Sequence, residues 1–463
     1  MKKVVQVSSH ASQRLKEARD ILSGRLSAQD TGRFHEGLLS LAESGSMRSP
    51  HHEIVKELCR AYSVGGNLRM ESYFTGGILP ELLNELVAFF RERFSLNWVK
   101  PRNIAIGLGV SQLFDAVCSM SLNPGDIVVS AAPYYHAFAD YPKKWGASFE
   151  YIQTSAEAGF KLTGAELDQW LRSNPDQATK VKLLLVVNPS IIGAIYSREE
   201  ARELIDAARR NNLLIFSDEI YRESVLNHGQ VCSFASIEGA QDIVITAHSG
   251  SKTRAIADLR IGWIAASEEI VNGVVEYCEN SFIYISTLIQ QAALMALRIP
   301  SSYIETDNRE SALRVEQILK WAERLNKSVR SEVVTIPVVP SAGHGILLCF
   351  NKMKKLFIKD FGVINSSLDL TAYFMRSLDG EPGVVVGPGH SLGLDDLSVR
   401  ICFSEIGGVN IHKHQDEAVC FQNGRDALSQ ALNRIAKRVK AALIVEPIYN
   451  FSANVQDTFQ ATP

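Results

Sequence analysis

The chain has 463 residues, of which 46% are hydrophobic and 21% charged, and its formal net charge is −3. This composition is typical of a globular protein and excludes a mostly disordered chain, a coiled coil and a collagen-like fibre. Proteins that grip the phosphodiester backbone usually carry a basic excess, so nucleic acid is not expected as a partner. The seven cysteines are widely spaced without a C-x-x-C pair, which predicts reduced thiols and no metal site.

No membrane or secretory segment is expected. The N-terminus, MKKVVQVSSHASQRLKEARD, has two lysines but no uninterrupted apolar region after them, unlike a signal peptide. The longest apolar runs, such as Leu183–Val187, have the length of a strand and are too short to span a membrane. We therefore expect a cytoplasmic protein.

The first part of the chain predicts an arm followed by a large α/β domain. Residues 1–48 are polar and mixed, with one predicted helix at Ser12–Leu22. Apolar runs that predict strands are Ile104–Ile106, Ile127–Ser130, Lys182–Val187, Leu213–Phe216 and Ile243–Thr246. Helical periodicity covers Glu53–Tyr62, Leu79–Phe94, Gln112–Leu122 and Arg198–Arg210. This alternation indicates parallel βαβ units, so residues 49–300 predict a three-layer α/β/α domain with a mostly parallel sheet.

The pattern changes beyond residue 300. Helices are predicted at Glu310–Leu325, Leu368–Leu378 and 424–445, and strands at Val333–Val339, Gly345–Phe350, Val384–Val386 and Ser398–Phe403. Residues 301–445 therefore predict a smaller α+β C-terminal domain. The last residues, 446–463, are expected to form a flexible tail.

Reactive side chains follow two neighbouring strands of the predicted sheet. Leu213–Phe216 is followed by Ser217-Asp218-Glu219-Ile220-Tyr221. Ile243–Thr246 is followed by Ser249-Gly250-Ser251-Lys252 and then by Arg260-Ile261-Gly262-Trp263. Each residue alone has an ordinary explanation, such as a helix cap or a surface ion pair. Together, at the edge where doubly wound sheets bind ligands, they predict an active site.

These motifs, S-x-S-K ahead of R-x-G-W and the preceding S-D-E-I-Y, resemble those of fold type I pyridoxal-phosphate enzymes. The similar branch is that of class I/II aminotransferases and ACC synthases, and the resemblance covers residues 37–405. It implies pyridoxal 5′-phosphate (PLP) as cofactor and three catalytic residues. Asp218 keeps the ring nitrogen protonated, Tyr221 hydrogen-bonds the ring O3′, and Lys252 forms the Schiff base and then removes the Cα proton.

The resemblance also implies which residues hold the cofactor. The turn Gly109-Val110-Ser111 opens a helix, where backbone N–H groups suit a phosphate. The other cofactor residues implied are Ser249, Ser251 and Arg260 at the phosphate, Tyr135 stacked on the ring, and Asn188 at O3′. Tyr73 resembles the tyrosine that reaches the phosphate of the neighbouring subunit, which implies a homodimer with shared active sites.

Two residues are implied in substrate binding. Arg400, in Val399-Arg400-Ile401, matches the arginine that clamps the α-carboxylate, for which a planar guanidinium is well suited. Glu43 ends the stretch Gly37–Glu43, which is similar to ACC synthases. The implied substrate is a free L-amino acid.

Two departures from the family pattern leave the reaction open. The segment Asn188–Gly193 is one residue shorter than N-P-x-N-P-x-G and lacks its second Asn-Pro, so Asn188 either contacts O3′ or the contact is lost. Asp258 stands where glycine is usual. The chemistry is either aminotransferase-like, or ACC synthase-like γ-elimination or replacement, cyclisation or oxidation in a specialised biosynthetic pathway. A regulator without turnover is disfavoured, because the arm is short and Lys252 is present.

Overall fold

The computed structural model describes residues 38–42, 44–63, 77–226, 230–406 and 417–444. The predicted helix at Ser12–Leu22 lies outside these residues. Within them, no helix is long and apolar enough to cross a membrane. No group of three or more His, Cys, Asp or Glu side chains in this part of the chain is arranged to hold a metal ion.

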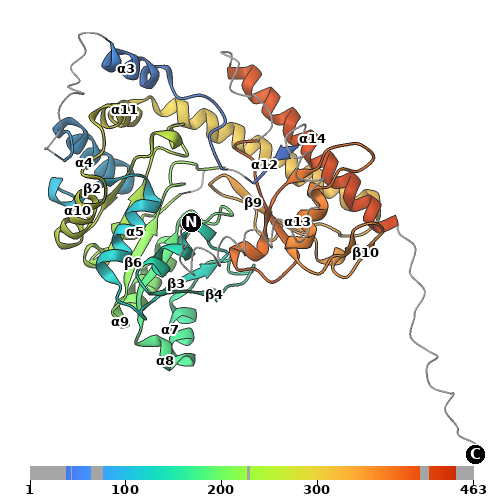
Figure 1. Ribbon diagram of the computed structural model, residues 1–463, viewed down its shortest axis with the longest axis horizontal. Coiled ribbons are helices and arrows are strands. Elements are labelled where there is room, and N and C mark those ends of the chain that lie inside the picture. Colours follow the sequence, from blue (N-terminus) through green and yellow to red (C-terminus); the bar gives the residue numbers. More distant parts are fainter. Residues whose placement is uncertain (1–37, 43, 64–76, 227–229, 407–416, 445–463) are drawn as a thin grey trace, which may run out of the picture.

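The larger part of the fold is built on a seven-stranded sheet (Figure 1). In spatial order its strands are β2 (Ile104–Gly107), β8 (Gly262–Ala265), β7 (Val244–His248), β6 (Leu214–Asp218), β5 (Val181–Val187), β3 (Ile127–Ala132) and β4 (Ser148–Gln153). Five adjacent strands, from β7 to β4, are parallel, and β8 is antiparallel to both of its neighbours. The predicted mostly parallel sheet is therefore confirmed.

Helices cover both faces of this sheet. Successive residues of a strand point to opposite faces, so Leu184 belongs to one hydrophobic core and Leu185 to the other. On the Leu184 side lie α4 (Pro80–Phe94), α7 (Gly164–Ser173), α9 (Arg198–Arg210) and α11 (Thr287–Arg298), with α3 (His52–Tyr62) against α11. On the Leu185 side lie α5 (Val110–Ser121) and α10 (Glu268–Phe282). The result is the predicted three-layer α/β/α arrangement.

The smaller part of the fold surrounds a separate core. Its sheet has the order β13 (Gly387–Pro388), β14 (Ser398–Cys402), β9 (Gly345–Cys349), and all pairs are antiparallel. Its helices are α12 (Ser301–Val329), α13 (Ser367–Met375) and α14 (Glu417–Ile444). A short hairpin joins β10 (Phe357–Ile358) to β11 (Gly362–Val363). This mixture of helices and antiparallel strands agrees with the α+β character predicted for the C-terminal region.

Two elements connect the parts. The strand β1 (Leu39–Ser40) pairs with β12 (Val384–Val385), and Leu39 and Leu41 are buried in the second core. Helix α12 contributes Tyr303 and Ile304 to the first core and Trp321 to the second. The segment before α3, expected to be an arm, is therefore tied to the small-domain core where the structure describes it.

Some sequence-based expectations differ from the structure. The strand predicted at Val333–Val339 is wrong: Thr335 makes only an isolated bridge to Cys349. Pro337 interrupts this run and Pro340 follows it directly, and proline has no N–H to donate to a neighbouring strand. The strands β4 and β8 were not predicted, since β4 is an edge strand with mostly half-exposed side chains and β8 has four residues.

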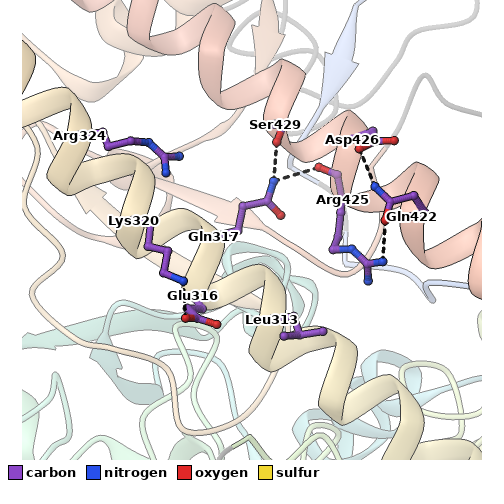
Figure 2. A pocket seen from close by; sticks show the side chains of 9 residues that line it. All are labelled: Leu313, Glu316, Gln317, Lys320, Arg324, Gln422, Arg425, Asp426 and Ser429. Atoms are coloured by element: carbon purple, nitrogen blue, oxygen red, sulfur yellow. Dashed lines mark hydrogen bonds and ion pairs between the residues drawn. The ribbon is translucent and has the colours of Figure 1, made fainter.

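Figure 2 shows a groove between α12 and α14, which lie side by side. Gln317 bridges the two helices, because its Nε2 donates to the Arg425 carbonyl at 2.9 Å and to Ser429 Oγ at 2.7 Å. The groove has a volume of about 390 Å³, and charged and polar side chains line most of it. None of the residues predicted for the active site lies along it.

Candidate active site

The sheet brings the predicted catalytic residues to one edge. Asp218 is the last residue of β6, where it is level with Val187 of β5 and Ala247 of β7. Lys252 lies in the turn that follows β7. The carboxyl ends of parallel strands meet at the same edge of a sheet. Asp218 and Lys252 are therefore near each other, and the charge of Lys252 lowers the pKa of Asp218.

Asp218 is a buried carboxyl group, 5% exposed. Burial raises its pKa to about 7, although the Ile220 N–H, 3.1 Å from Oδ1, and the charge of Lys252 oppose the rise. A buried carboxylate of this kind is stabilised by a cation placed beside it. The protonated ring nitrogen of PLP is such a cation, so the environment of Asp218 fits the role predicted for it.

Ser44 connects Lys252 with Tyr221. The Nζ of Lys252 donates to the Ser44 carbonyl at 2.5 Å, and the Tyr221 hydroxyl lies 2.9 Å from Ser44 Oγ. Tyr221 is buried, 5% exposed, three residues after Asp218. The amine, the phenol and the carboxyl group therefore share one small site, as the motifs predict.

The predicted phosphate turn is built by two glycines that approach each other closely. Gly109 has a φ of +89° and caps α5, so the N–H groups of Val110 and Ser111 lie in a first helical turn without intrahelical partners. A β carbon on Gly262 would lie 2.9 Å from both Gly109 C and Val110 N. Only glycine lets β8 support this turn so closely.

Arg260 and two serines lie beside the same turn. A β carbon on Gly109 would lie 2.8 Å from Arg260 Nη2, which shows that the guanidinium rests against the turn. It donates to the carbonyls of Ala257 at 2.8 Å and Leu108 at 3.3 Å. Ser249 Oγ donates to the Ile261 carbonyl at 2.6 Å and lies 2.8 Å from Ser251 Oγ. Helical N–H groups, an arginine and hydroxyls form a donor set that fits a phosphate.

Arg400 reaches this edge from the small domain. It lies on β14 opposite Leu347, and its Nε donates to the Ile191 carbonyl at 2.8 Å. Gly345 makes room for it, since a β carbon there would lie 2.6 Å from Arg400 Nε. Burial raises the pKa of the nearby Tyr135, and the charge of Arg400 opposes that rise. Tyr135 is 40% exposed, which leaves ring surface for stacking.

Asn188 is engaged with the backbone. Its side chain is fully buried; Oδ1 accepts the Tyr196 N–H at 3.1 Å, and Nδ2 donates to the Cys232 carbonyl at 2.9 Å. The amide thus joins two loops, and the predicted O3′ contact stays a prediction. Asp258 is exposed in the turn Ala257–Leu259.

Two predicted residues, Glu43 and Tyr73, lie outside the described residues. Three residues of the site were missed by sequence reasoning, namely Ser44, Ser224 and His344. The one local signal was Gly343-His344-Gly345, a polar residue between two glycines just before β9.

Comparisons with known proteins agree with this geometry. Residues 43–407 match the family described as aminotransferase class I and II. An aspartate aminotransferase of Bacillus sp. (strain YM-2) is 30% identical over 250 residues, which cover 53% of this chain and 62% of that protein. The chain thus matches less than two thirds of the length of that relative. An aspartate aminotransferase of Pyrococcus abyssi is 26% identical over 68% of this chain and 75% of its own length.

Solved structures share the fold. A crystal structure of an aromatic aminotransferase from Pyrococcus horikoshii OT3 has a TM-score of 0.72 at 21% identity, and covers 89% of this chain and 97% of that one. The aspartate aminotransferase of Rhizobium meliloti has a TM-score of 0.71 at 20% identity, with 93% and 97% covered. The predicted fold class and the family resemblance are confirmed, and members of this family use PLP.

Replacing Gly262 with alanine is expected to weaken PLP binding. The new β carbon would press on the Gly109–Val110 turn, and overpacking of this kind costs about 1–3 kcal/mol. If PLP needs the turn in its strained position, that cost lowers PLP affinity by roughly 5- to 150-fold. Titration of the cofactor-free protein with PLP measures the effect. Gly273→Ala is the control, because the tight contacts of its β carbon, at 3.0 and 3.2 Å, would be with the flexible end of the Met120 side chain. Equal PLP affinity in Gly262→Ala and in the control would contradict the inference that β8 supports the turn.

Asp218→Asn is expected to stabilise the cofactor-free protein in a pH-dependent way. The raised pKa means that the folded state binds the Asp218 proton more tightly than the unfolded state. Stability is therefore lost as the pH rises from the ordinary carboxyl pKa through the raised value of about 7, and neutral asparagine avoids this loss. Urea unfolding of both proteins at about pH 4 and about pH 8 should show the gain only at the higher pH. A gain that is the same at both pH values is the contrary result.

Proposed function

The chain belongs to the aminotransferase class I and II family, and from this premise we propose that it is a PLP-dependent enzyme that takes the amino group from a free L-amino acid. The observation that carries the proposal is the meeting of Asp218, Tyr221 and Lys252 at one sheet edge, with Arg400 reaching it from the second domain. Each of these groups has a separate task in such a reaction.

The residues around the phosphate turn and Asp218 bind the cofactor in this proposal. When bound, PLP supplies a ring that withdraws electrons from the Cα of an attached amino acid. Asp218 would hold the protonated ring nitrogen, because a cation beside the buried carboxylate stabilises its charged form. The N–H groups of Val110 and Ser111, together with Arg260, would hold the phosphate. Tyr135 would cover one face of the ring.

Lys252 is the group that moves the proton at Cα. Its amine is half-buried and donates to the Ser44 carbonyl, so it is already held next to the Tyr221 hydroxyl. Positioned general acid–base catalysis of this kind contributes roughly 10²- to 10⁴-fold in rate. Tyr221 would donate its hydroxyl to the ring oxygen that faces it.

Arg400 orients the substrate. Its Nε donates to the Ile191 carbonyl, which fixes the plane of the guanidinium, and the side chain also has a hydrogen-bond interaction with Tyr221. The remaining donors suit the two oxygens of an α-carboxylate. Because Arg400 belongs to the small domain, binding a carboxylate there would draw the two parts of the fold together.

A second candidate reaction is favoured by Asn188. Its amide holds the Tyr196 and Cys232 backbones, and the segment that follows lacks the family's second Asn-Pro. With the Asn188 amide held by these backbones, the cofactor's O3′ would be held by a different set of side chains from the one the family pattern supplies. This favours ACC synthase-like γ-elimination or replacement, cyclisation or oxidation of an amino acid as the alternative outcome.

We extend the proposal to a homodimer with shared active sites. It rests on Tyr73, whose sequence context Tyr73-Phe74-Thr75-Gly76 resembles that of a tyrosine acting on the neighbouring subunit. Mixing Tyr73→Phe subunits with Lys252→Ala subunits should then restore activity to some hybrid sites. An active protein that sediments as a monomer at assay concentration would refute the dimer.

The experiment that tests the proposed function begins with the holoenzyme. Borohydride reduction and peptide mapping should place the pyridoxyl group on Lys252. Incubation with a panel of amino acids should then release keto acids and require 2-oxoglutarate for repeated turnover. Label on another lysine would contradict the site. Turnover without any amino acceptor would favour the alternative reactions instead.

Arg400→Lys is expected to weaken all amino-acid substrates alike, because the lost contact does not involve their side chains. One charge-assisted bidentate contact contributes about 1.5–3 kcal/mol, or roughly 10- to 150-fold in kcat/KM. PLP affinity should not change, since Arg260 and the Gly109 turn hold the phosphate independently. Amines without a carboxylate should show little loss. The prediction would be wrong if the mutant lost its cofactor or if the wild-type enzyme preferred amines without a carboxylate. Arg400 would then have a structural role.

A further inference from the structure

His344 enters the active site between two glycines. Gly343 has a φ of +78°, and a β carbon there would lie 3.6 Å from the Tyr221 ring. A β carbon on Gly345 would lie 2.5 Å from the Ile191 carbonyl oxygen and 2.6 Å from Arg400 Nε. Glycine is thus favoured at 343 by its positive φ and required at 345 by the close approach to Ile191 and Arg400, and His344 between them is 6% exposed.

The imidazole lies between two hydroxyl groups. Its Nδ1 lies 3.4 Å from Ser44 Oγ, and its Nε2 lies 3.1 Å from Ser224 Oγ. Its edge packs against the Tyr221 ring, with the centroids 5.3 Å apart. Ser44 in turn touches both the Tyr221 hydroxyl and, through its carbonyl, Lys252 Nζ. His344 is therefore one contact away from two groups of the proposed chemistry.

Ser224 gives the imidazole a rigid anchor. Its N–H donates to the Tyr221 carbonyl at 2.9 Å, and its own carbonyl accepts the Gly343 N–H at 2.7 Å. The next residue, Val225, bridges to Ala342. The loop after Tyr221 and the loop before β9 are thus paired, and this pairing fixes both ends of the Ser224–His344 contact.

Burial and nearby positive charge keep the imidazole neutral. Burial is the larger cause, and together with the charges of Lys252, Arg400 and Arg314 it lowers the pKa of His344 to about 3. A neutral imidazole has one N–H donor and one acceptor nitrogen. It can therefore donate to one serine and accept from the other, which orients both hydroxyls without adding a third cation to the site.

We propose that His344 is a positioning residue of the active site, which acts through Ser44 to orient the Tyr221 hydroxyl and the Lys252 amine. This inference rests on the proposed function, because that function gives the two groups their tasks. A histidine that only filled space would be replaceable by phenylalanine, which has a similar shape but no ring nitrogen. His344→Phe removes both contacts, whereas His344→Asn keeps a polar atom at the position of Nδ1.

The test compares these variants as holoenzymes. The first readout is the pH titration of the bound cofactor's absorption, which reports the environment of Tyr221 and Lys252 without substrate. His344→Phe should shift the midpoint by about one pH unit, a tenfold change in proton affinity. It should also lower kcat on the order of 10²-fold, with little change in KM. His344→Asn, which keeps the contact with Ser44 but not the one with Ser224, should recover part of both losses.

A control and a second variant complete the experiment. Thr371→Val removes a hydroxyl that is also buried but lies on α13 in the small domain, and it should leave the midpoint and kcat unchanged. Ser224→Ala removes the anchor and should shift the midpoint in the same direction as His344→Phe. If His344→Phe does not fold, Ser224→Ala and His344→Asn decide the question.

The outcomes separate this inference from the proposed function. An unchanged midpoint in His344→Phe, or in Ser224→Ala where the first variant fails to fold, overturns the role of His344. A wild type that carries PLP on Lys252 but forms no keto acid overturns the proposed reaction, while the midpoint shift still supports the positioning role. A wild type that binds no PLP overturns both.

Discussion

The buried carboxyl group of Asp218 is the constraint on which the rest of the site depends. At 5% exposure it has lost most of its hydration, and the Ile220 N–H and the charge of Lys252 only partly compensate, so its pKa stays raised to about 7. A protein gains no stability from such a group when nothing cationic binds beside it. In the function proposed above, a cationic ligand beside the last residue of β6 supplies this stabilisation. The neighbouring strand ends must then supply whatever holds that ligand in place, and β7 does so through the turn that carries Lys252, Ser249 and Ser251.

The remaining parts are positioned by contacts between distant segments of the chain. Gly262 on β8 packs against the Gly109–Val110 turn, and the guanidinium of Arg260, two residues before β8 begins, rests against the same turn. Arg400 comes from the small domain and rests on the Ile191 carbonyl. The segment that begins at β1 pairs with β12 of the small domain, then passes Lys252 at Ser44. A site assembled in this way depends on the relative position of both parts of the fold.

The sequence predicts those features that are encoded locally. The apolar runs of β5, β6 and β7 are short and continuous, and helix α9 has the predicted bounds because Ser197 and Glu200 form a capping box at its start. Lys252, Asp218 and Arg260 could be found because each lies in a short motif at a strand end. Ser44 and His344 could not, since their contact joins residues 300 positions apart and the glycines beside His344 do not indicate which residues it contacts. Asn188 shows the opposite case: its position in a familiar segment suggests a cofactor contact, but its amide is used by the Tyr196 and Cys232 backbones.

The backbone contacts of Asn188 make the Tyr221 hydroxyl more important for the proposed contact with the ring oxygen O3′. If the amide stays with the backbone, Tyr221 is the described residue best placed to donate a hydrogen bond to the ring oxygen. When only one side chain donates to the ring oxygen, its orientation matters more than when two side chains donate, because no second contact compensates for its misalignment. The contacts around it serve this need: the hydroxyl lies 2.9 Å from Ser44 Oγ, the ring packs on His344, and Ser224 ties the following loop to the backbone before β9. In the proposed site, the backbone contacts of Asn188 and the buried imidazole of His344 beside Tyr221 therefore act on the same hydroxyl.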